Sequence, residues 1–154
     1  MFKALLPAAA ALGLIAFGAQ TQSQGVADAP AAMAWHLSHE GDMAKLAYGV
    51  ENSDQLALMM TCAPGDRTAV VYGEVQPRSA NLQRASFGPV EVDPLSGGDA
   101  VEMRIGLGDP TLVRLSEGRG LAVQGEAGAF DLPTTRTEQR MIQGFLAYCG
   151  SAHV

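Results

Sequence analysis

Basic residues are scarce in this sequence and are not clustered. Lysine occurs only at positions 3 and 45, and 10 Lys and Arg residues stand against 16 Asp and Glu residues, for a formal net charge of -6. An acidic surface without a basic stripe repels phosphate backbones. The composition therefore argues against a nucleic-acid-binding protein.

The short motifs of common nucleophilic enzymes are also missing. Neither Gly-x-Ser-x-Gly nor Ser-x-x-Lys is present. The glycine pairs within residues 106–108 and 118–120 indicate turns, because neither stands in the strand–loop–helix setting of a phosphate-binding loop. Carboxylates are plentiful, but no pattern pairs two of them as acid and base across a cleft. These absences favour a protein that is not an enzyme, with an envelope hydrolase as an alternative.

Long apolar runs are confined to the N-terminus. Residues 4–17 follow Lys3 without a charge, and the polar stretch 20–24 comes soon after them. A charged start, a short apolar core and small residues before a polar stretch are typical of a secretory signal peptide. The apolar run has about fourteen residues, fewer than the roughly twenty that cross a bilayer as a helix. We therefore predict a signal peptide over residues 1–18, no membrane anchor after processing, and a periplasmic or secreted protein.

The rest of the chain has the length of one domain. Residues 19–32 are rich in Gln, Ala, Gly and Pro with little periodicity, which is typical of a flexible lead. Residues 33–154 then predict a single β-rich domain that is long enough to bury a core.

Apolar residues alternate along most of this domain, with the period of half-buried strands. The pattern is clear within residues 46–50, 56–62, 68–75 and 101–105, while residues 89–99 indicate a loop. Shorter alternations occur at Val113 with Leu115, Leu121 with Val123, and Phe130 with Leu132. About seven to nine short strands separated by turns predict an antiparallel β-sandwich or barrel.

The C-terminal segment has a helical period instead. Thr135 and Glu138 match a capping box, in which each side chain satisfies a free backbone N–H of the other. Gly150 stands where a helix often ends in a left-handed residue. Five apolar residues fall on one helical face between them: Met141, Ile142, Phe145, Leu146 and Cys149. We predict one helix near residues 136–148 that covers a face or an end of the β-structure.

The sequence has only two cysteines, Cys62 at the end of a predicted strand and Cys149 at the end of the predicted helix. Two cysteines in an exported chain permit one pairing. Closing a loop of about ninety residues stabilises a fold by up to about 4.5 kcal/mol. Redox pairs favour the Cys-x-x-Cys spacing, which is absent here. We therefore predict a structural disulfide that ties the helix to the β-structure.

His36 and His39 are the candidate metal ligands, with Glu40 and Asp42 close by. Imidazole and carboxylate groups bind zinc or copper. Within a strand, however, two residues an odd number apart point to opposite faces, and residues 38–42 are typical of the polar tip of a hairpin. We predict no bound metal and no other cofactor, and a copper or zinc carrier that uses the two histidines is the alternative.

Six of the seven methionines follow the predicted signal peptide, and thioethers are copper ligands in exported carriers. Met60, Met103 and Met141 fall on the inward faces of the predicted elements. Because methionine readily fills irregular gaps in a core, we expect these three to pack inside the protein.

Four stretches of the sequence resemble a group of small exported proteins of Gram-negative bacteria. They are Trp35, the run 45–50 (KLAYGV), the strand end 60–65 (MTCAPG) and the closing run 145–150 (FLAYCG). The resemblance implies export and a shared framework, and it implies no activity because the group has no known function.

Residues 96–100 are similar to the Ser-Gly-rich inhibitory loop of periplasmic lysozyme inhibitors, which are small disulfide-bridged β-barrels. Val101 stands where those inhibitors have a tyrosine. This resemblance implies a lysozyme-type inhibitor as a second alternative. The residues together predict a non-catalytic exported module that binds an unknown envelope protein or ligand.

Cleavage of the leader can be measured directly. Ala16 and Gly18 fit the small residues required before a signal-peptidase cut, so the mature protein should begin at Ala19 or within a few residues of it. Intact-mass analysis of an osmotic-shock fraction from a Gram-negative host measures this start. A product that keeps Met1 or that pellets with membranes would contradict the prediction.

Overall fold

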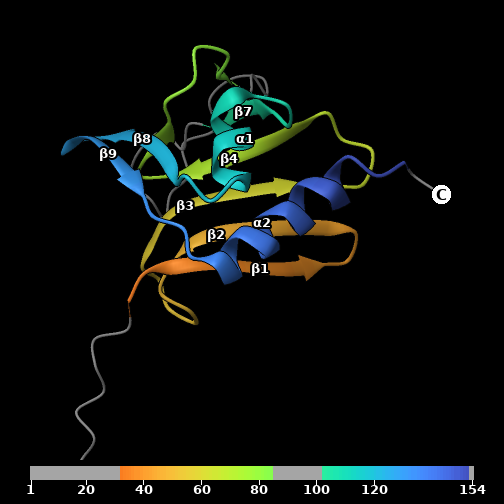
Figure 1. Cartoon of the computed structure of the whole chain (residues 1–154), viewed down its shortest axis with the longest axis horizontal. Helices are drawn as coiled ribbons and strands as arrows, with labels where there is room; N and C mark the ends of the chain where they lie inside the picture. Colours follow the sequence, from red (N-terminus) through yellow and green to blue (C-terminus); the bar gives the residue numbers. More distant parts are fainter. Residues whose placement is uncertain (1–31, 85–101, 153–154) are drawn as a thin grey trace, which may run out of the picture.

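The strands of this protein form two antiparallel sheets, seen in a computed structural model that describes residues 32–84 and 102–152 (Figure 1). The large sheet has the order β1-β2-β3-β4-β7-β6 and the small sheet has the order β5-β8-β9. The large sheet consists of β1 (Ala34–Glu40), β2 (Met43–Gly49), β3 (Leu56–Cys62), β4 (Thr68–Gly73), β6 (Gln83–Arg84) and β7 (Met103–Gly106). The small sheet consists of β5 (Gln76–Pro77), β8 (Leu121–Gly125) and β9 (Gly128–Leu132).

Two helices accompany the sheets, α1 (Pro110–Ser116) and α2 (Arg136–Cys149). Figure 1 shows α2 lying across one face of the large sheet, in front of β1 and β2. The predicted class is confirmed: the fold is mainly β and antiparallel, with a C-terminal helix that a disulfide ties to the sheet. The described strands make two separate sheets and not one closed barrel.

The core lies between the large sheet and the helices. Leu46, Met60 and Val71 stand opposite one another on neighbouring strands, and all three are fully buried. Ile142 and Phe145 of α2 are fully buried in the same cluster. Alternation along each strand explains this arrangement, because every second side chain points to the face that α2 covers. Met60 is therefore a core residue as predicted, and Met103 and Met141 are half-buried against the core.

The hairpin of β1 and β2 is longer than the sequence pattern indicated. Ser38 pairs with Lys45 and His39 pairs with Ala44, so the polar residues before Gly41 belong to the strand. The turn itself is Gly41 with Asp42, and Gly41 has a φ of +58°. The prediction of a hairpin tip over residues 38–42 was therefore too wide. Polar side chains are tolerated there because β1 is the edge strand.

A second helix stands where the sequence pattern indicated a strand. Val113 and Leu115 lie in α1, so the strand predicted from their alternation was wrong. Asp109 caps this helix by accepting a hydrogen bond from the Thr111 N–H at 2.8 Å, and Pro110 takes the first helical position, where no N–H is needed. Leu112 and Leu115, three residues apart, are the buried side chains of α1.

The N-terminus of α2 is joined to the outer edge of β1. The predicted capping box is present between Thr135 and Glu138. The Trp35 backbone N–H also donates to Glu138 Oε1 at 2.8 Å, and the Trp35 indole donates to the Pro133 carbonyl at 3.0 Å. The Trp35 ring stands edge-on to the Tyr48 ring at 5.2 Å between centroids. One carboxylate therefore caps the helix and holds the strand.

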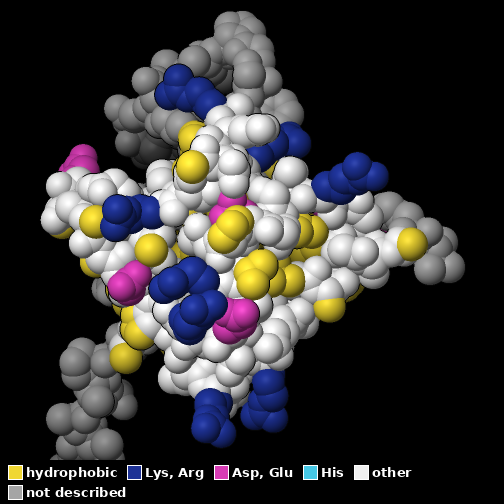
Figure 2. All heavy atoms as spheres, turned by 45° about the horizontal axis from the view of Figure 1, so that its top comes forward, with side chains coloured by type: hydrophobic (Ala, Val, Ile, Leu, Met, Phe, Trp, Pro, Cys, Tyr) yellow, Lys and Arg dark blue, Asp and Glu magenta, His cyan; other side chains and the backbone are white. Residues whose placement is uncertain are grey.

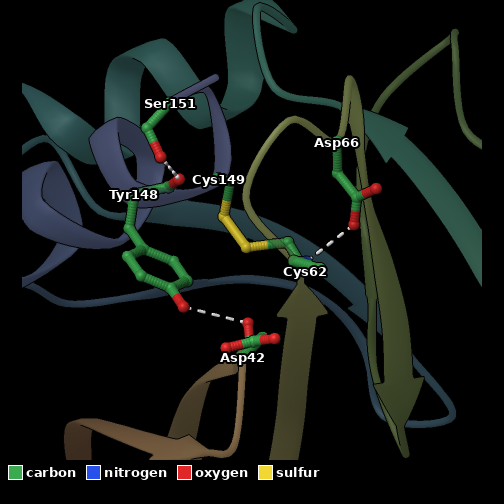
Figure 3. The surroundings of a disulfide bond; sticks show 7 residues. Asp42, Cys62, Asp66, Tyr148, Cys149 and Ser151 are labelled. Carbon is green, nitrogen blue, oxygen red and sulfur yellow. Dashed lines mark hydrogen bonds between the residues drawn. A yellow bond between two sulfur atoms is a disulfide. The ribbon is translucent and has the colours of Figure 1, made fainter. Parts of the chain in front are cut away.

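The C-terminus of α2 is joined to the other end of the sheet (Figure 3). Cys149 forms the predicted disulfide with Cys62, across 87 residues of chain. The Gly65 N–H donates to the Cys149 carbonyl at 2.8 Å, and the Tyr148 hydroxyl donates to the Asp42 carbonyl at 3.0 Å. Covalent and hydrogen bonds together fix this end of the helix on the strands.

Gly150 ends α2 in a right-handed conformation, with a φ of -79°, and the predicted left-handed ending was wrong. Its N–H still bonds to the Leu146 carbonyl, as in a continuing helical turn. The Ser151 N–H bonds to the Tyr148 carbonyl, so carbonyls of the last turn find partners without a left-handed residue.

Gly73 lets the chain leave the large sheet after β4. Its φ is +131°, and a Cβ atom added there would overlap the carbonyl oxygen of Ala57. Only glycine fits this combination of backbone conformation and close approach. The next residues then turn to β5, where Gln76 pairs with Gln124 of β8 in the small sheet.

Reduction of the disulfide should weaken the fold markedly. The bond closes a loop of 87 residues, and its loss should lower the free energy of unfolding by up to about 4.5 kcal/mol. Urea unfolding of the oxidised and the reduced protein measures the difference, and non-reducing peptide mapping should show the single pair Cys62–Cys149. Equal urea midpoints for the two forms would contradict this prediction.

The hydrogen bonds of Glu138 with Thr135 and Trp35 join α2 to β1, and this junction should make the free energy of unfolding depend on pH. Burial opposes ionisation of this carboxyl, but hydrogen bonds from Thr135 and from the Trp35 N–H, with the nearby His36, lower its pKa below the ordinary 4.5. A lowered pKa adds stability that is present above about pH 4.5 and is lost as the pH falls through the folded-state value. Glu138→Gln should therefore cost about 1 kcal/mol at pH 7, and its difference from the wild type should shrink on acidification.

Glu51→Gln is the matched control for this measurement, since Glu51 lies in an exposed turn between β2 and β3. Urea unfolding of the three proteins between pH 7 and pH 3 compares them. A Glu138→Gln penalty that stays constant across this range would show that the charge of Glu138 is not what stabilises the junction.

Candidate functional site

The large sheet has a second face, on the side opposite to α2, which lies in front of the sheet in Figure 1. We call it the open face and define it by His36, Ala47, Met59, Thr61, Val70 and Tyr72. Four of these residues form a row across four strands, in the order His36, Ala47, Met59 and Tyr72. Cross-strand neighbours in such a row are in side-chain contact range. The row therefore runs from an imidazole across an apolar centre to a phenol.

A second row runs beside the first on the same face. Its order is Ser38, Lys45, Thr61, Val70 and Arg104. Thr61 is 6% exposed, whereas Met59, Val70 and Tyr72 are half-buried. The centre of the open face is therefore apolar and only partly shielded from water, with polar side chains on both sides.

Tyr72 has polar neighbours at the centre of this face. They are Thr61 and Glu102, the residue just before β7. Burial, and secondly the Glu102 charge, raise the pKa of Tyr72 above its ordinary value. The phenol thus stays protonated at neutral pH. It offers an apolar ring with a hydroxyl that can donate or accept.

Charged side chains border the open face at the β1–β2 end. Lys45 forms an ion pair with Glu40, which is exposed. A hydrogen bond from Lys45, and secondly its charge, lower the pKa of Glu40 below the ordinary value. These groups offer charged contacts at the margin of the apolar centre.

The two predicted metal candidates lie on opposite faces of β1. His36 is on the open face, with Nε2 3.2 Å from the Gly49 carbonyl oxygen. His39 is on the covered face, where its ring stands edge-on to the Tyr148 ring at 4.9 Å. The alternation of a strand separates them, so they do not converge on one ion. Within the described part of the chain, no three His, Cys, Asp or Glu side chains gather in a way that could hold a metal.

One buried carboxylate was not singled out from the sequence. Asp109 is 6% exposed and accepts hydrogen bonds from the Ser79 hydroxyl at 2.6 Å and the Asn81 amide at 3.1 Å. Burial opposes its ionisation, but bonds from Ser79, Thr111 and Asn81 together lower its pKa. The bonds from Ser79 and Asn81 tie the start of α1 to the loop before β6, and the bond from the Thr111 N–H caps the helix. The Asp-Pro pair that starts α1 is the sequence signal that could have identified it.

The helix-bearing side of the molecule has a different character from the open face. Figure 2 shows Lys and Arg side chains spread over it, with acidic side chains among them and small hydrophobic areas between. A hollow beside α2 is lined, as far as the structure describes it, by Arg136, Gln139 and Arg140. The Gln139 side chain has a structural role in this hollow, because its amide donates to the Ser116 carbonyl of α1 at 3.2 Å.

Several sequence predictions fall on residues that the structure does not describe. They are the signal peptide over 1–18, most of the lead over 19–32, the predicted loop 89–99, and the stretch 96–100 that is similar to the lysozyme-inhibitor loop. Neither helix in residues 32–84 and 102–152 is long and apolar enough to cross a membrane.

Comparison with known proteins supplies no relative. The chain matches no protein-family model, and no curated protein or solved structure is significantly similar to it. The function must therefore be argued from the residues themselves.

Proposed function

We propose that this chain is a non-catalytic exported module, periplasmic or secreted, that binds a partner protein of the cell envelope through its open face. The observation that supports this proposal is the apolar centre of that face, formed by the half-buried residues Met59, Val70 and Tyr72. Tyrosine and methionine are enriched at protein interfaces, and apolar centres with polar margins are the usual anatomy of such interfaces.

The strands and the disulfide behind the open face make it a rigid surface, which favours binding. Strands hold the side chains in fixed register, and the Cys62–Cys149 disulfide ties the opposite layer to the same sheet. A surface that is already ordered loses little conformational entropy when a partner docks. Tyr72 adds a directional hydrogen bond to the apolar contact.

The side-chain arrangement supports binding over catalysis. The imidazole of His36 faces the Gly49 carbonyl, and the ring of His39 faces Tyr148. Neither of these two contacts involves a serine or cysteine that could act as a nucleophile, and a nucleophile needs such a base beside it. Both cysteines are in the disulfide and are not nucleophiles.

Site-specific cross-linking in living cells tests the proposal. A photo-reactive phenylalanine analogue replaces Val70 on the open face or Val113 on α1, which is 41% exposed on the helix-bearing side. The leader-bearing protein is irradiated in a Gram-negative host. We expect discrete adducts with an envelope protein from position 70 and none from position 113. Identical adducts at both positions, or no adduct at position 70, would count against the open face.

A charge substitution measures the same interaction once the adduct is identified. Val70→Arg should weaken binding of that partner by about tenfold or more, because it places an unpaired charge in the apolar centre. Val113→Arg is the matched control and should leave the affinity unchanged. Circular dichroism and thermal melting of both variants establish that each remains folded.

A further inference from the structure

We propose a second binding site, at the start of α2, which binds the phosphate group of a phosphate monoester. The site is the hollow beside α2 that is lined, as far as the structure describes it, by Arg136, Gln139 and Arg140. We call it the arginine site. It belongs to the helix that lies on the other side of the large sheet from the open face (Figure 1), so it does not depend on the function proposed above.

The charges of α2 are placed against the dipole of the helix. Its only charged residues are Arg136, Glu138 and Arg140, all at its N-terminal end, and its last turn has no basic residue. A helix has a partial positive charge at its N-terminus, so cations stabilise it at the opposite end. The two arginines therefore stand at the unfavourable end of α2.

The two arginines also repel each other. Residues four apart share one side of a helix, with about 5–6 Å between their Cβ atoms, and like charges at this spacing are destabilising. Both side chains are exposed. Neither guanidinium forms an ion pair or a hydrogen bond with a residue in the ranges 32–84 and 102–152. This end of the helix thus has two positive charges that no group in those ranges pairs with.

Glu138 stands between the arginines in the sequence, but its carboxylate is bonded elsewhere. Its Oε1 accepts the Trp35 N–H at 2.8 Å, and its Oε2 accepts the Thr135 N–H at 2.6 Å. Residues two apart on a helix do not face each other. Glu138 therefore joins α2 to β1, while the side chains of Arg136 and Arg140 leave the helix on a different side.

The backbone beneath the arginine site is held in place by α1. The side-chain amides of Gln139 and Gln143 both donate to the Ser116 carbonyl, at 3.2 Å and 2.8 Å. Arg136 precedes Gln139 by three residues and Arg140 precedes Gln143 by three, so the arginines share this side of α2. A ligand therefore meets a backbone that is already ordered, which lowers the entropic cost of binding.

The charges of the site specify the ligand. A guanidinium has one positive charge, and its planar fork of N–H groups fits the oxygens of a phosphate. Two guanidiniums one helical turn apart match a group with about two negative charges. A phosphate monoester has this charge at pH 7, because its second pKa is about 6, whereas a phosphate diester has a single charge. Bound there, the dianion also removes the repulsion between the arginines.

Titration of the full processed chain with glycerol 3-phosphate tests the proposal. Backbone amide shifts should be largest within residues 136–140. Affinity should rise between about pH 5 and pH 7, as the phosphate gains its second charge. Dimethyl phosphate keeps one negative charge and should bind more weakly by about threefold or more.

Charge-neutral variants test the two arginines. Arg136→Gln and Arg140→Gln should each weaken glycerol 3-phosphate binding by about tenfold or more. Arg67→Gln is the matched control, because Arg67 is also exposed and lies in the β3–β4 turn, whose Gly65 contacts the C-terminal end of α2. It should leave the affinity unchanged. Since the arginines repel each other, both α2 variants should melt, without ligand, at or above the temperature of the wild type.

A second arm distinguishes a soluble ligand from a lipid headgroup with the same chemistry. Vesicles of phosphatidylcholine and phosphatidic acid in equal amounts present a phosphate monoester at a membrane surface, and vesicles of phosphatidylcholine alone do not. Sedimentation with the first kind only, lost in Arg140→Gln, would assign the site to a lipid. Binding of glycerol 3-phosphate without sedimentation would assign it to a soluble molecule. Either result supports the proposal.

The proposal is overturned if neither glycerol 3-phosphate nor the phosphatidic acid vesicles bind, if dimethyl phosphate binds as well as glycerol 3-phosphate, or if Arg67→Gln weakens binding as much as Arg140→Gln. Lower melting temperatures of both α2 variants without ligand would also overturn it, by showing that the arginines stabilise the fold. The cross-link from position 70 reports on a different surface, so its result stands in each of these cases.

Discussion

The attachment of α2 at both of its ends is the constraint on which the rest of this structure depends. At the N-terminal end, Glu138 caps the helix and also accepts the outward N–H of Trp35. At the C-terminal end, Cys149 is bonded covalently to Cys62 of β3. The helix cannot shift along the sheet while both attachments hold. Its buried face therefore stays in register with the strands below it.

Because α2 is attached in this way, the two faces of the large sheet differ in their roles. The covered face contributes its alternate side chains to the core, where Leu46, Met60 and Val71 are fully buried. The same strands present Met59, Val70 and Tyr72 on the other face, where all three are half-buried. Stability comes from one face and the proposed binding from the other. Substitutions on the open face should therefore change recognition more than folding.

Local patterns in the sequence were sufficient for much of the fold. The capping box of Thr135 and Glu138 and the strand over residues 56–62 were identified because their periods and end signals lie within a few neighbouring residues. The helix α1 was missed because Val113 and Leu115 also fit the short alternation of a strand. The open face was not recognisable as a unit. Met59 and Tyr72 become neighbours only once β3 and β4 are paired, and no local signal states which strands pair.

The sequence by itself determined the class of the fold, the helix at the C-terminus and the pairing of its only two cysteines. Each of these follows from composition, from short-range periodicity or from simple counting. Only the tertiary structure decided that His36 and His39 belong to different surfaces and that Glu138 reaches the backbone of Trp35. These are contacts between residues far apart in the chain. The packing of the whole molecule brings such residues together, so they cannot be read from any single segment.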